Sequence, residues 1–148
     1  MDAQLVDVVV VGAGQSGLAA GYFLKRAGVD FTILESHPRV GDGWRERWES
    51  LRLFTPARYS SLPGLKFPSP GGSFPGKDEF ADYLESYAQH FGLPVRTGVQ
   101  VLTVRKAGDL FEIQTDAGPL LARAVVASPG ATTARYVPDV ALELDGEI

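Results

Sequence analysis

The feature that most restricts the fold of this chain is a glycine-rich turn near its N-terminus. A run of nearly all aliphatic residues, Leu5 to Val11, ends in four consecutive valines and leads directly into Gly12-Ala13-Gly14-Gln15-Ser16-Gly17. An aliphatic run of this length predicts a strand that is buried on both faces of a parallel sheet, with helices on both sides. The glycines then predict a tight turn from that strand into a helix.

The residues after the turn complete a β-α-β unit. Apolar residues recur at helical spacing from Gln15 to Ala27, and Gly28 stands where a helix with a left-handed C-terminal residue ends. Phe31 to Glu35 then predicts a second strand.

The rest of the chain predicts a long loop, one helix and an antiparallel β-meander. Ser36 to Gly76 holds six of the ten prolines, and its aromatic content indicates an ordered loop wrapped over something. Lys77 to Phe91 carries a single apolar stripe and predicts a helix. Three more strands are expected at Val95–Arg105, Leu110–Thr115 and Leu120–Ala127. We therefore predict an α/β fold, a Rossmann-like parallel sheet joined to the meander, in one domain over residues 1–148.

Composition excludes several classes of function. The formal charge of −4 gives no field that attracts nucleic acid or an anionic membrane. The absence of cysteine removes disulfides, thiolate chemistry and cysteine-bound metals, and no grouping of His, Asp and Glu has the spacing of metal ligands. No signal peptide or membrane span precedes the first strand, so we expect a cytoplasmic protein without a metal.

The turn matches the GxGxxG pattern of dinucleotide-binding folds, and its context meets the other requirements of that pattern. It follows a strand, opens a helix and is followed by Glu35 at the end of the next strand. Gly12 permits the tight turn, Gly14 lets the backbone approach a diphosphate, and Gly17 allows the helix to pack closely.

The same residues predict how an adenine dinucleotide is bound. Free backbone N–H groups of Gln15 and Ser16, together with the helix dipole, form an anion site. Glu35 accepts hydrogen bonds from ribose hydroxyls and repels a 2′-phosphate, which favours FAD or NAD over NADP and leaves the choice between FAD and NAD open. The alternative is that the glycines only make a turn in a fold that binds nothing. Ser16 is not expected to be a hydrolase nucleophile, because Leu18 stands where that motif requires glycine.

The segment after Glu35 resembles the second signature of flavin-containing and Baeyer-Villiger monooxygenases. In these families a glycine and a tryptophan follow the ribose-binding glutamate, as Gly43 and Trp44 do here. The similarity continues through residues 47–59 and 74–79, which look like the bacterial branch of FAD-dependent oxidoreductases. The resemblance implies a flavoprotein oxidoreductase or monooxygenase that binds FAD and uses NADPH as co-substrate.

The resemblance also implies which residues bind the cofactor. The stretch near Trp44 and Thr55 is expected to lie against the flavin and its ribityl chain, and Val101 is expected to meet the adenine through its backbone. No side chain is expected to be catalytic, because the flavin is the catalyst and the protein positions it. The full expected set is Gly12, Gly14, Gln15, Ser16, Gly17, Glu35, Gly43, Trp44, Thr55 and Val101.

The chain departs from the family in two places. Ala127-Ser128-Pro129-Gly130 stands where the family has an Ala-Thr-Gly turn, and the chain stops before the family's second glycine motif, its NADPH domain and the C-terminal segment of its FAD domain. Monooxygenase activity by this chain alone is therefore not expected. A partner chain or a missing C-terminal domain would complete the FAD site. Two alternatives remain open, a stand-alone adenine-dinucleotide binder without turnover and a remnant that binds no cofactor.

The other conspicuous side chains receive structural interpretations. Trp48 is expected to be a core or loop-packing aromatic. His37 and His90, the two histidines of the chain, are not expected to act as catalytic bases. Most arginines of the loop are expected to be solvated or paired with Glu46 and Glu49. They are Arg45, Arg47, Arg52 and Arg58.

Overall fold

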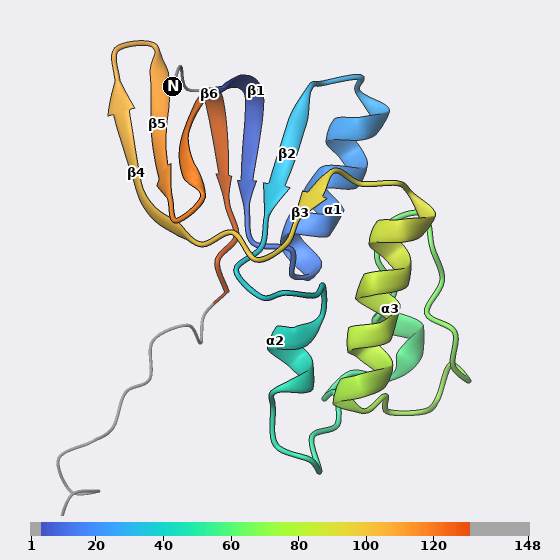
Figure 1. Ribbon diagram of the computed structural model, residues 1–148. Coiled ribbons are helices and arrows are strands. Elements are labelled where there is room, and N and C mark those ends of the chain that lie inside the picture. The colour runs from blue at the N-terminus through green and yellow to red at the C-terminus, as the bar shows by residue number, and fades with distance from the viewer. Residues whose placement is uncertain (1–3, 131–148) are drawn as a thin grey trace, which may run out of the picture.

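The computed structural model describes residues 4–130, which form a six-stranded sheet with helices packed beside it (Figure 1). The strands are β1 Gln4–Val11, β2 Phe31–Leu34, β3 Val95–Arg96, β4 Val101–Ala107, β5 Leu110–Thr115 and β6 Gly118–Ala127. The helices are α1 Gln15–Arg26, α2 Asp42–Arg45 and α3 Lys77–His90, with a 3-10 turn, η1, at Ala57–Tyr59. The predicted α/β fold class is confirmed.

The valine run forms the central strand of the parallel part of the sheet. Strand β1 pairs in parallel with β2 on one side and with β6 on the other, so that Val10 lies opposite both Ile33 and Val126. Val9 and Val10 are fully buried, as expected for β-branched side chains on the two faces of a central strand. The β-α-β unit predicted from the first 35 residues is confirmed.

The strand predicted over Val95–Arg105 is wrong, because the structure divides it into two. The sheet order is β3-β2-β1-β6-β5-β4, so β3 and β4 lie at opposite edges of the sheet. Gly98 adopts a φ of +66°, which ends the extended conformation between them. The connecting residues cross the carboxyl ends of the inner strands (Figure 1). The β-meander itself is confirmed, with β4-β5 and β5-β6 antiparallel.

The described residues bury two apolar clusters, one against each face of the sheet. One contains side chains of α1 and α3, among them Leu18, Leu84 and Tyr87, together with strand residues. The other contains strand residues and Val99 but no helical residue, because the meander curls over that face. The expectation of helices on both faces is therefore wrong for residues 4–130.

The long loop between β2 and α3 has little regular structure, as predicted, and helix α3 anchors it. The Tyr83 hydroxyl donates to the Leu65 carbonyl at 2.7 Å and accepts from the Leu62 N–H at 2.6 Å. The Tyr87 hydroxyl donates to the Pro63 carbonyl at 2.6 Å, and burial raises the pKa of Tyr87 to about 12. These buried hydroxyls fix the course of the loop over the helix.

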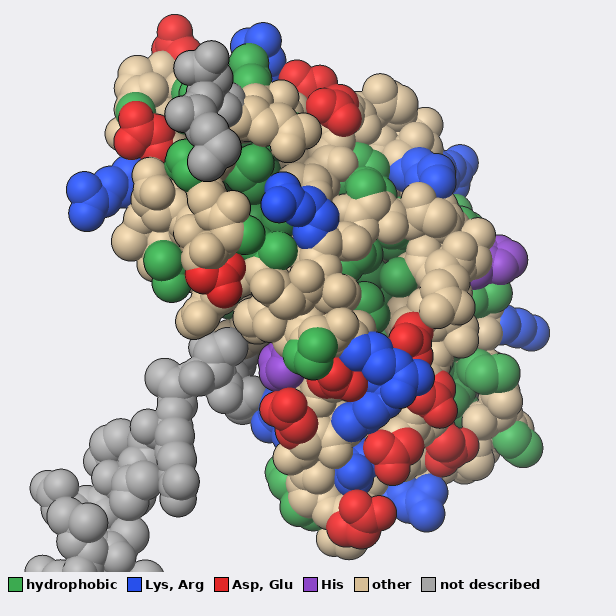
Figure 2. Space-filling model, in the orientation of Figure 1, with side chains coloured by type: hydrophobic (Ala, Val, Ile, Leu, Met, Phe, Trp, Pro, Cys, Tyr) green, Lys and Arg blue, Asp and Glu red, His purple; other side chains and the backbone are tan. Residues whose placement is uncertain are grey.

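None of the helices within residues 4–130 combines the length and the apolar character that crossing a bilayer requires. Figure 2 shows basic and acidic side chains intermixed over the region of α2 and α3. Such mixing matches the small net charge of −4.

Candidate cofactor-binding site

A cleft of about 890 Å³ opens at the carboxyl ends of β1, β2 and β6. Its walls come from the glycine turn, from the residues that follow β2, from α2, and from the segment that crosses between β3 and β4. Ser128, Pro129 and Gly130, directly after β6, complete the wall. The edge where parallel strands end is where open α/β sheets bind their ligands, and a cleft of this size suits a cofactor.

The glycines of the turn are required for different steric reasons. Gly12 has a φ of +95°, and a Cβ there would lie 2.3 Å from the Ser128 carbonyl oxygen. A Cβ at Gly17 would lie 1.9 Å from the carbonyl oxygen of Gly12. A Cβ at Gly14 would meet nothing within 4 Å. The fold therefore needs Gly12 and Gly17, whereas at Gly14 the space in front of the backbone is open to the cleft.

Helix α1 presents its N-terminus to this open space. Gly14 is the N-cap residue in an extended conformation, and the first bond of the helix runs from the Leu18 N–H to the Gly14 carbonyl at 3.0 Å. The N–H groups of Gln15, Ser16 and Gly17 thus precede the helical hydrogen-bond pattern. The first turn contains no acidic residue that would neutralise the positive end of the helix dipole.

Glu35 lies buried beside the turn, with 9% of its surface exposed. Its Oε2 accepts a hydrogen bond from the Ala13 N–H at 2.8 Å, and its Oε1 accepts one from the His37 N–H at 2.9 Å. Burial raises the pKa of Glu35, but the hydrogen bonds from the backbone of His37 and Ala13 and from the His37 ring outweigh it, so the net shift is downward. Glu35 is therefore an anion that ties the end of β2 to the glycine turn.

His37 joins the site, which the sequence did not indicate. Its ring Nδ1 lies 2.7 Å from Glu35 Oε1, and its Nε2 lies 3.4 Å from Glu46 Oε2 at the C-terminal end of α2. The hydrogen bond with Glu35 raises the pKa of His37. The position of His37, two residues after Glu35, does not by itself indicate a contact between the two side chains. The contact depends on the chain turning back after β2, which brings the His37 ring to the Glu35 carboxylate.

Trp44 forms part of the cleft wall while packing on the core. Its ring meets the Phe80 ring edge-to-face, with 4.8 Å between centroids. Helix α2, which carries it, is held by Arg45, whose guanidinium contacts Asp42 and Asp82 at 2.9 and 2.8 Å. The Lys77 ammonium donates to the Arg45 carbonyl at 2.8 Å. Although α2 is short, it is therefore held in place by the side chain of its own Arg45 and by Lys77 of α3.

The expectation that most loop arginines are solvated or paired with Glu46 and Glu49 holds for Arg52 and Arg58, whose side chains are exposed. Glu46 pairs with His37, and Glu49 pairs with Lys77. The arginines have other partners: Arg45 contacts Asp42, Asp82 and Glu85, Arg47 donates to the Gly43 carbonyl, Arg52 pairs with Glu79, and Arg58 lies over the Tyr59 ring. Trp48, expected to be a packing aromatic, is 62% exposed, because α2 ends before it and the loop leaves the core.

The structure brings most of the expected cofactor residues together. Those that line the cleft are Gly12, Gly14, Gln15, Glu35, Gly43, Trp44 and Val101. Ser16 and Gly17 belong to the same turn but are not part of the cleft wall, and Thr55 lies outside it, with its hydroxyl 3.2 Å from Ser60 Oγ. Besides His37, the sequence reasoning missed Val99 and Gln100, because their place depends on the long-range crossing of the sheet.

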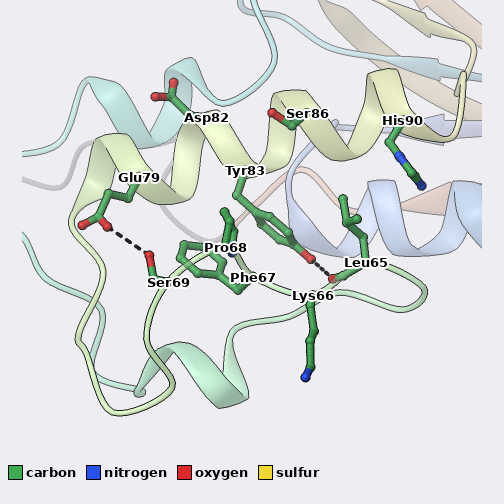
Figure 3. Close-up of a pocket in the computed structure, with 10 residues that line it drawn as sticks. All are labelled: Leu65, Lys66, Phe67, Pro68, Ser69, Glu79, Asp82, Tyr83, Ser86 and His90. Atoms are coloured by element: carbon green, nitrogen blue, oxygen red, sulfur yellow. Dashed lines mark hydrogen bonds between the residues drawn. The ribbon is translucent and has the colours of Figure 1, made fainter.

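A second cavity, of about 500 Å³, lies between α3 and residues 65–69. Figure 3 shows that its polar groups largely serve the fold, since Tyr83 bonds to Leu65 and Ser69 to Glu79. Glu79, Asp82 and Lys66 line it, and no residue of the glycine turn does. The larger cleft is therefore the better candidate for a dinucleotide.

Within residues 4–130 there is no group of three or more His, Asp and Glu side chains arranged to hold a metal ion.

Comparison with known proteins agrees with the geometry. Residues 9–145 match the family described as pyridine nucleotide-disulphide oxidoreductase. The "Uncharacterized oxidoreductase CzcO-like" of Geobacillus kaustophilus is 42% identical over 97% of this chain and 41% of its own length. Indole-3-pyruvate monooxygenase YUCCA1 of Oryza sativa subsp. japonica is 38% identical over 88% of this chain and 33% of its own.

The similarity to known proteins extends to solved structures. A flavin-containing monooxygenase from Stenotrophomonas maltophilia superposes with a TM-score of 0.85 and 41% identity, over 92% of this chain and 42% of that chain. The resemblance to flavin-containing monooxygenases is confirmed. The chain spans about two fifths of the length of the first of these relatives. By its matched residues, its fold and its glycine turn, this chain belongs to the pyridine nucleotide-disulphide oxidoreductase family.

Proposed function

We propose that this chain is the FAD-binding part of an NAD(P)H-dependent flavoprotein oxidoreductase or monooxygenase. One observation carries the proposal: the open face of Gly14 at the start of α1 lies beside a buried anionic Glu35, which is hydrogen-bonded to Ala13 of the same turn. The turn suits a diphosphate, and the carboxylate suits a ribose diol without a 2′-phosphate. The residues present thus fit an adenine dinucleotide.

The proposal assigns a task to each part of the cleft. The N–H groups of Gln15 and Ser16 bind the diphosphate, Glu35 binds the adenosine ribose, and the backbone of Val101 faces the adenine. Gly43 and Trp44, which also line the cleft, are assigned to the flavin end by the family resemblance. Bound FAD would supply hydride and oxygen chemistry, and the protein's own groups bind, orient and shield it. Thr55 stays assigned to the flavin only by resemblance, since it lies outside the cleft wall.

FAD rather than NAD is supported by the relatives. The Stenotrophomonas maltophilia structure is named a flavin-containing monooxygenase, and the rice relative is named a monooxygenase. The reaction class that we favour is therefore that of a monooxygenase or a related oxidoreductase.

The nicotinamide site is proposed to come from a C-terminal domain or a partner chain. The relatives are longer than this chain, which spans 41% of the Geobacillus kaustophilus protein. Small-molecule cofactors are the expected ligands, and a cytoplasmic location belongs to this proposal. The second candidate is a stand-alone adenine-dinucleotide binder without turnover, which the completeness of the turn and the ribose site within one short chain favours.

The experiment that tests the proposal is purification under native conditions, followed by an absorbance scan over the flavin bands and reconstitution with FAD. We expect a yellow protein, or a colourless one that takes up FAD in preference to NAD. A protein that binds neither contradicts the proposal. If FAD binds, bleaching of the flavin by NADPH separates an enzyme from a binding module, and NADPH consumption with candidate substrates measures turnover.

A further inference from the structure

The carboxylate of Glu35 is already heavily engaged before any ribose is bound. Oε2 accepts from the Ala13 N–H at 2.8 Å, while Oε1 accepts from the His37 N–H at 2.9 Å and lies 2.7 Å from His37 Nδ1. A carboxylate offers about four acceptor positions, and a ribose diol donates two hydrogen bonds. The imidazole and the ribose therefore compete for the same oxygen.

The His37 ring stands between two carboxylates on the wall of the cleft. Glu35 at the end of β2 contacts Nδ1, and Glu46 at the end of α2 lies 3.4 Å from Nε2. Arg47 is the other charged side chain of the cleft wall, and the segment that crosses from β3 contributes the neutral residues Val99 and Gln100. The charge around the ring is thus mainly negative, and it favours the imidazolium form.

Protonation of His37 and binding of a ribose by Glu35 are thermodynamically linked. The contact with Glu35 raises the pKa of His37 above its ordinary value of 6.5. When ribose hydroxyls take over Oε1, the imidazolium loses part of its partner, so the pKa of His37 falls toward the ordinary value. A group that binds its proton more weakly in the complex than in the free protein releases it on binding. The affinity for the dinucleotide then increases with pH between the pKa of His37 in the complex and its pKa in the free protein. Outside this range the affinity does not depend on pH.

We propose that His37 is a positioning residue of the ribose site, which acts through Glu35 and couples dinucleotide binding to the release of a proton. This inference rests on the proposed function, because it assigns Glu35 to the ribose. It adds a titrating residue to a recognition site otherwise built from backbone and one carboxylate. The bound dinucleotide replaces the hydrogen bond of His37 Nδ1 to Oε1, while the bond from Ala13 to Oε2 keeps the carboxylate in place.

The test is a series of FAD titrations of the full 148-residue chain, by flavin fluorescence, from about pH 5.5 to about pH 8.5. We expect the affinity of the wild-type chain to rise with pH, by at most about tenfold per pH unit, the limit for one proton. His37→Gln keeps a neutral donor near Glu35 and should give a flat profile, with affinity close to that of wild type at the alkaline end. His90→Gln, which removes the other histidine at the far end of α3, should retain the wild-type slope.

The outcomes separate this inference from the function beneath it. A wild-type chain that binds no FAD at any pH removes the proposed function and this inference with it. A chain that binds FAD with the same slope in wild type and His37→Gln removes the inference alone. Proton NMR of the histidine rings gives a readout that does not depend on affinity. The pKa of His37 should lie above 6.5 in the free chain, and it should fall both in Glu35→Gln and on saturation with FAD. A His37 pKa that FAD leaves unchanged overturns the inference.

Discussion

At the scale of single residues, the glycines of one short turn divide the work of folding and binding. Gly12 and Gly17 have backbone atoms where a Cβ would stand, so they are required by the protein itself. Gly14 has open space there and an ordinary φ of −75°. A substitution at Gly14 therefore separates the cofactor site from the stability of the fold, which no substitution at the other two can do.

Gly14→Val should weaken FAD binding and leave the fold intact. The side chain would fill the space where the diphosphate approaches, and we expect a loss of affinity of at least about tenfold, or ~1.4 kcal/mol. Stability should change by no more than about 1 kcal/mol, the usual cost at an N-cap position. Titration with FAD and urea unfolding measure the two effects. Gly72→Val is the matched control, since Gly72 is also open and lies away from the cleft. Undiminished binding in Gly14→Val would place the diphosphate elsewhere.

Gly17→Ala should have the opposite effect, a loss of stability. Its methyl group would stand 1.9 Å from the Gly12 carbonyl oxygen, and the backbone of the turn would have to shift. Overpacking of this kind costs about 2–3 kcal/mol. Urea unfolding in the absence of FAD measures the loss, with Gly14→Ala as the control at the same turn. Equal stabilities of the two alanine variants would contradict this account of the turn.

The pair of Glu35 and His37 makes stability depend on pH with a definite sign. The pKa of His37 is raised, so its contribution is full below 6.5 and is lost as the pH rises through the folded value above 6.5. The pKa of Glu35 is lowered, so its contribution is full above 4.5 and is lost as the pH falls through the folded value below 4.5. Wild type should therefore exceed His37→Gln in unfolding free energy near pH 6, by a margin that shrinks toward pH 8.5. Urea unfolding at several pH values tests this, and a margin that grows with pH would be inconsistent with it.

At the scale of elements, the site depends on how α2 is clamped against α3. Helix α2 spans only Asp42–Arg45, too short to be stable by itself. Arg45 connects it to α3 through Asp82 and Glu85, and Lys77 binds the carbonyl at its C-terminal end. The wall of the cleft that carries Trp44 is therefore held by tertiary contacts.

Arg45→Met should loosen this wall. The guanidinium is 17% exposed and contacts three carboxylates, so its removal leaves partly buried charges without their partner. We expect a loss of about 2 kcal/mol in unfolding free energy, the scale of hydrogen bonds to charged groups, together with weaker FAD binding. Arg39→Met is the control, because Arg39 is 54% exposed and pairs with Glu85 alone. It should cost less than about 1 kcal/mol. A larger effect at Arg39 than at Arg45 would refute the clamp.

The sequence predicted the elements that local patterns determine. The valine run, the glycine turn and the apolar stripe of Lys77 to Phe91 are each recognisable within their own segment. The bounds of the strand and of the helices in the structure agree with the predicted bounds within a residue or so. The sequence does not predict the division of Val95–Arg105. Gly98 is the main interruption within this segment, and the strands that pair with its two halves are not revealed by the pattern of the segment itself. For the same reason the sequence does not predict the place of His37 in the site. Its contacts require Glu35 and Glu46 to come together on either side of its ring. Where a contact is not local, the pattern of one segment does not reveal it.

At the scale of the whole molecule, the long loop leaves several aromatic side chains in solvent. Phe54 is 97% exposed, and Trp48, Tyr59 and Phe74 of the same loop are also exposed. The Phe54 side chain therefore offers apolar surface through which copies of the isolated chain can associate.

Phe54→Ser should reduce association of the isolated chain without changing its stability. The side chain makes so little contact with the fold that its removal should alter the unfolding free energy by less than about 0.5 kcal/mol. Sedimentation velocity at high protein concentration measures association, and binding of a hydrophobic dye measures the exposed apolar surface. Leu53→Ser at the neighbouring position, which packs against the core, should instead destabilise the chain. If Phe54→Ser lowers the unfolding free energy as much as Leu53→Ser does, the Phe54 side chain is not exposed to solvent in the folded chain.

The parallel pairing of β1 with β6 also governs how this chain is made. On the ribosome β1 emerges first and can pair with β2 soon afterwards, but its other edge waits for Gly118–Ala127, because Val10 lies opposite Val126. Until then a valine-rich strand presents unpaired backbone groups, which is the usual template for association with another chain. The central strand of the parallel part of the sheet thus keeps one edge unpaired until Gly118–Ala127 has been made.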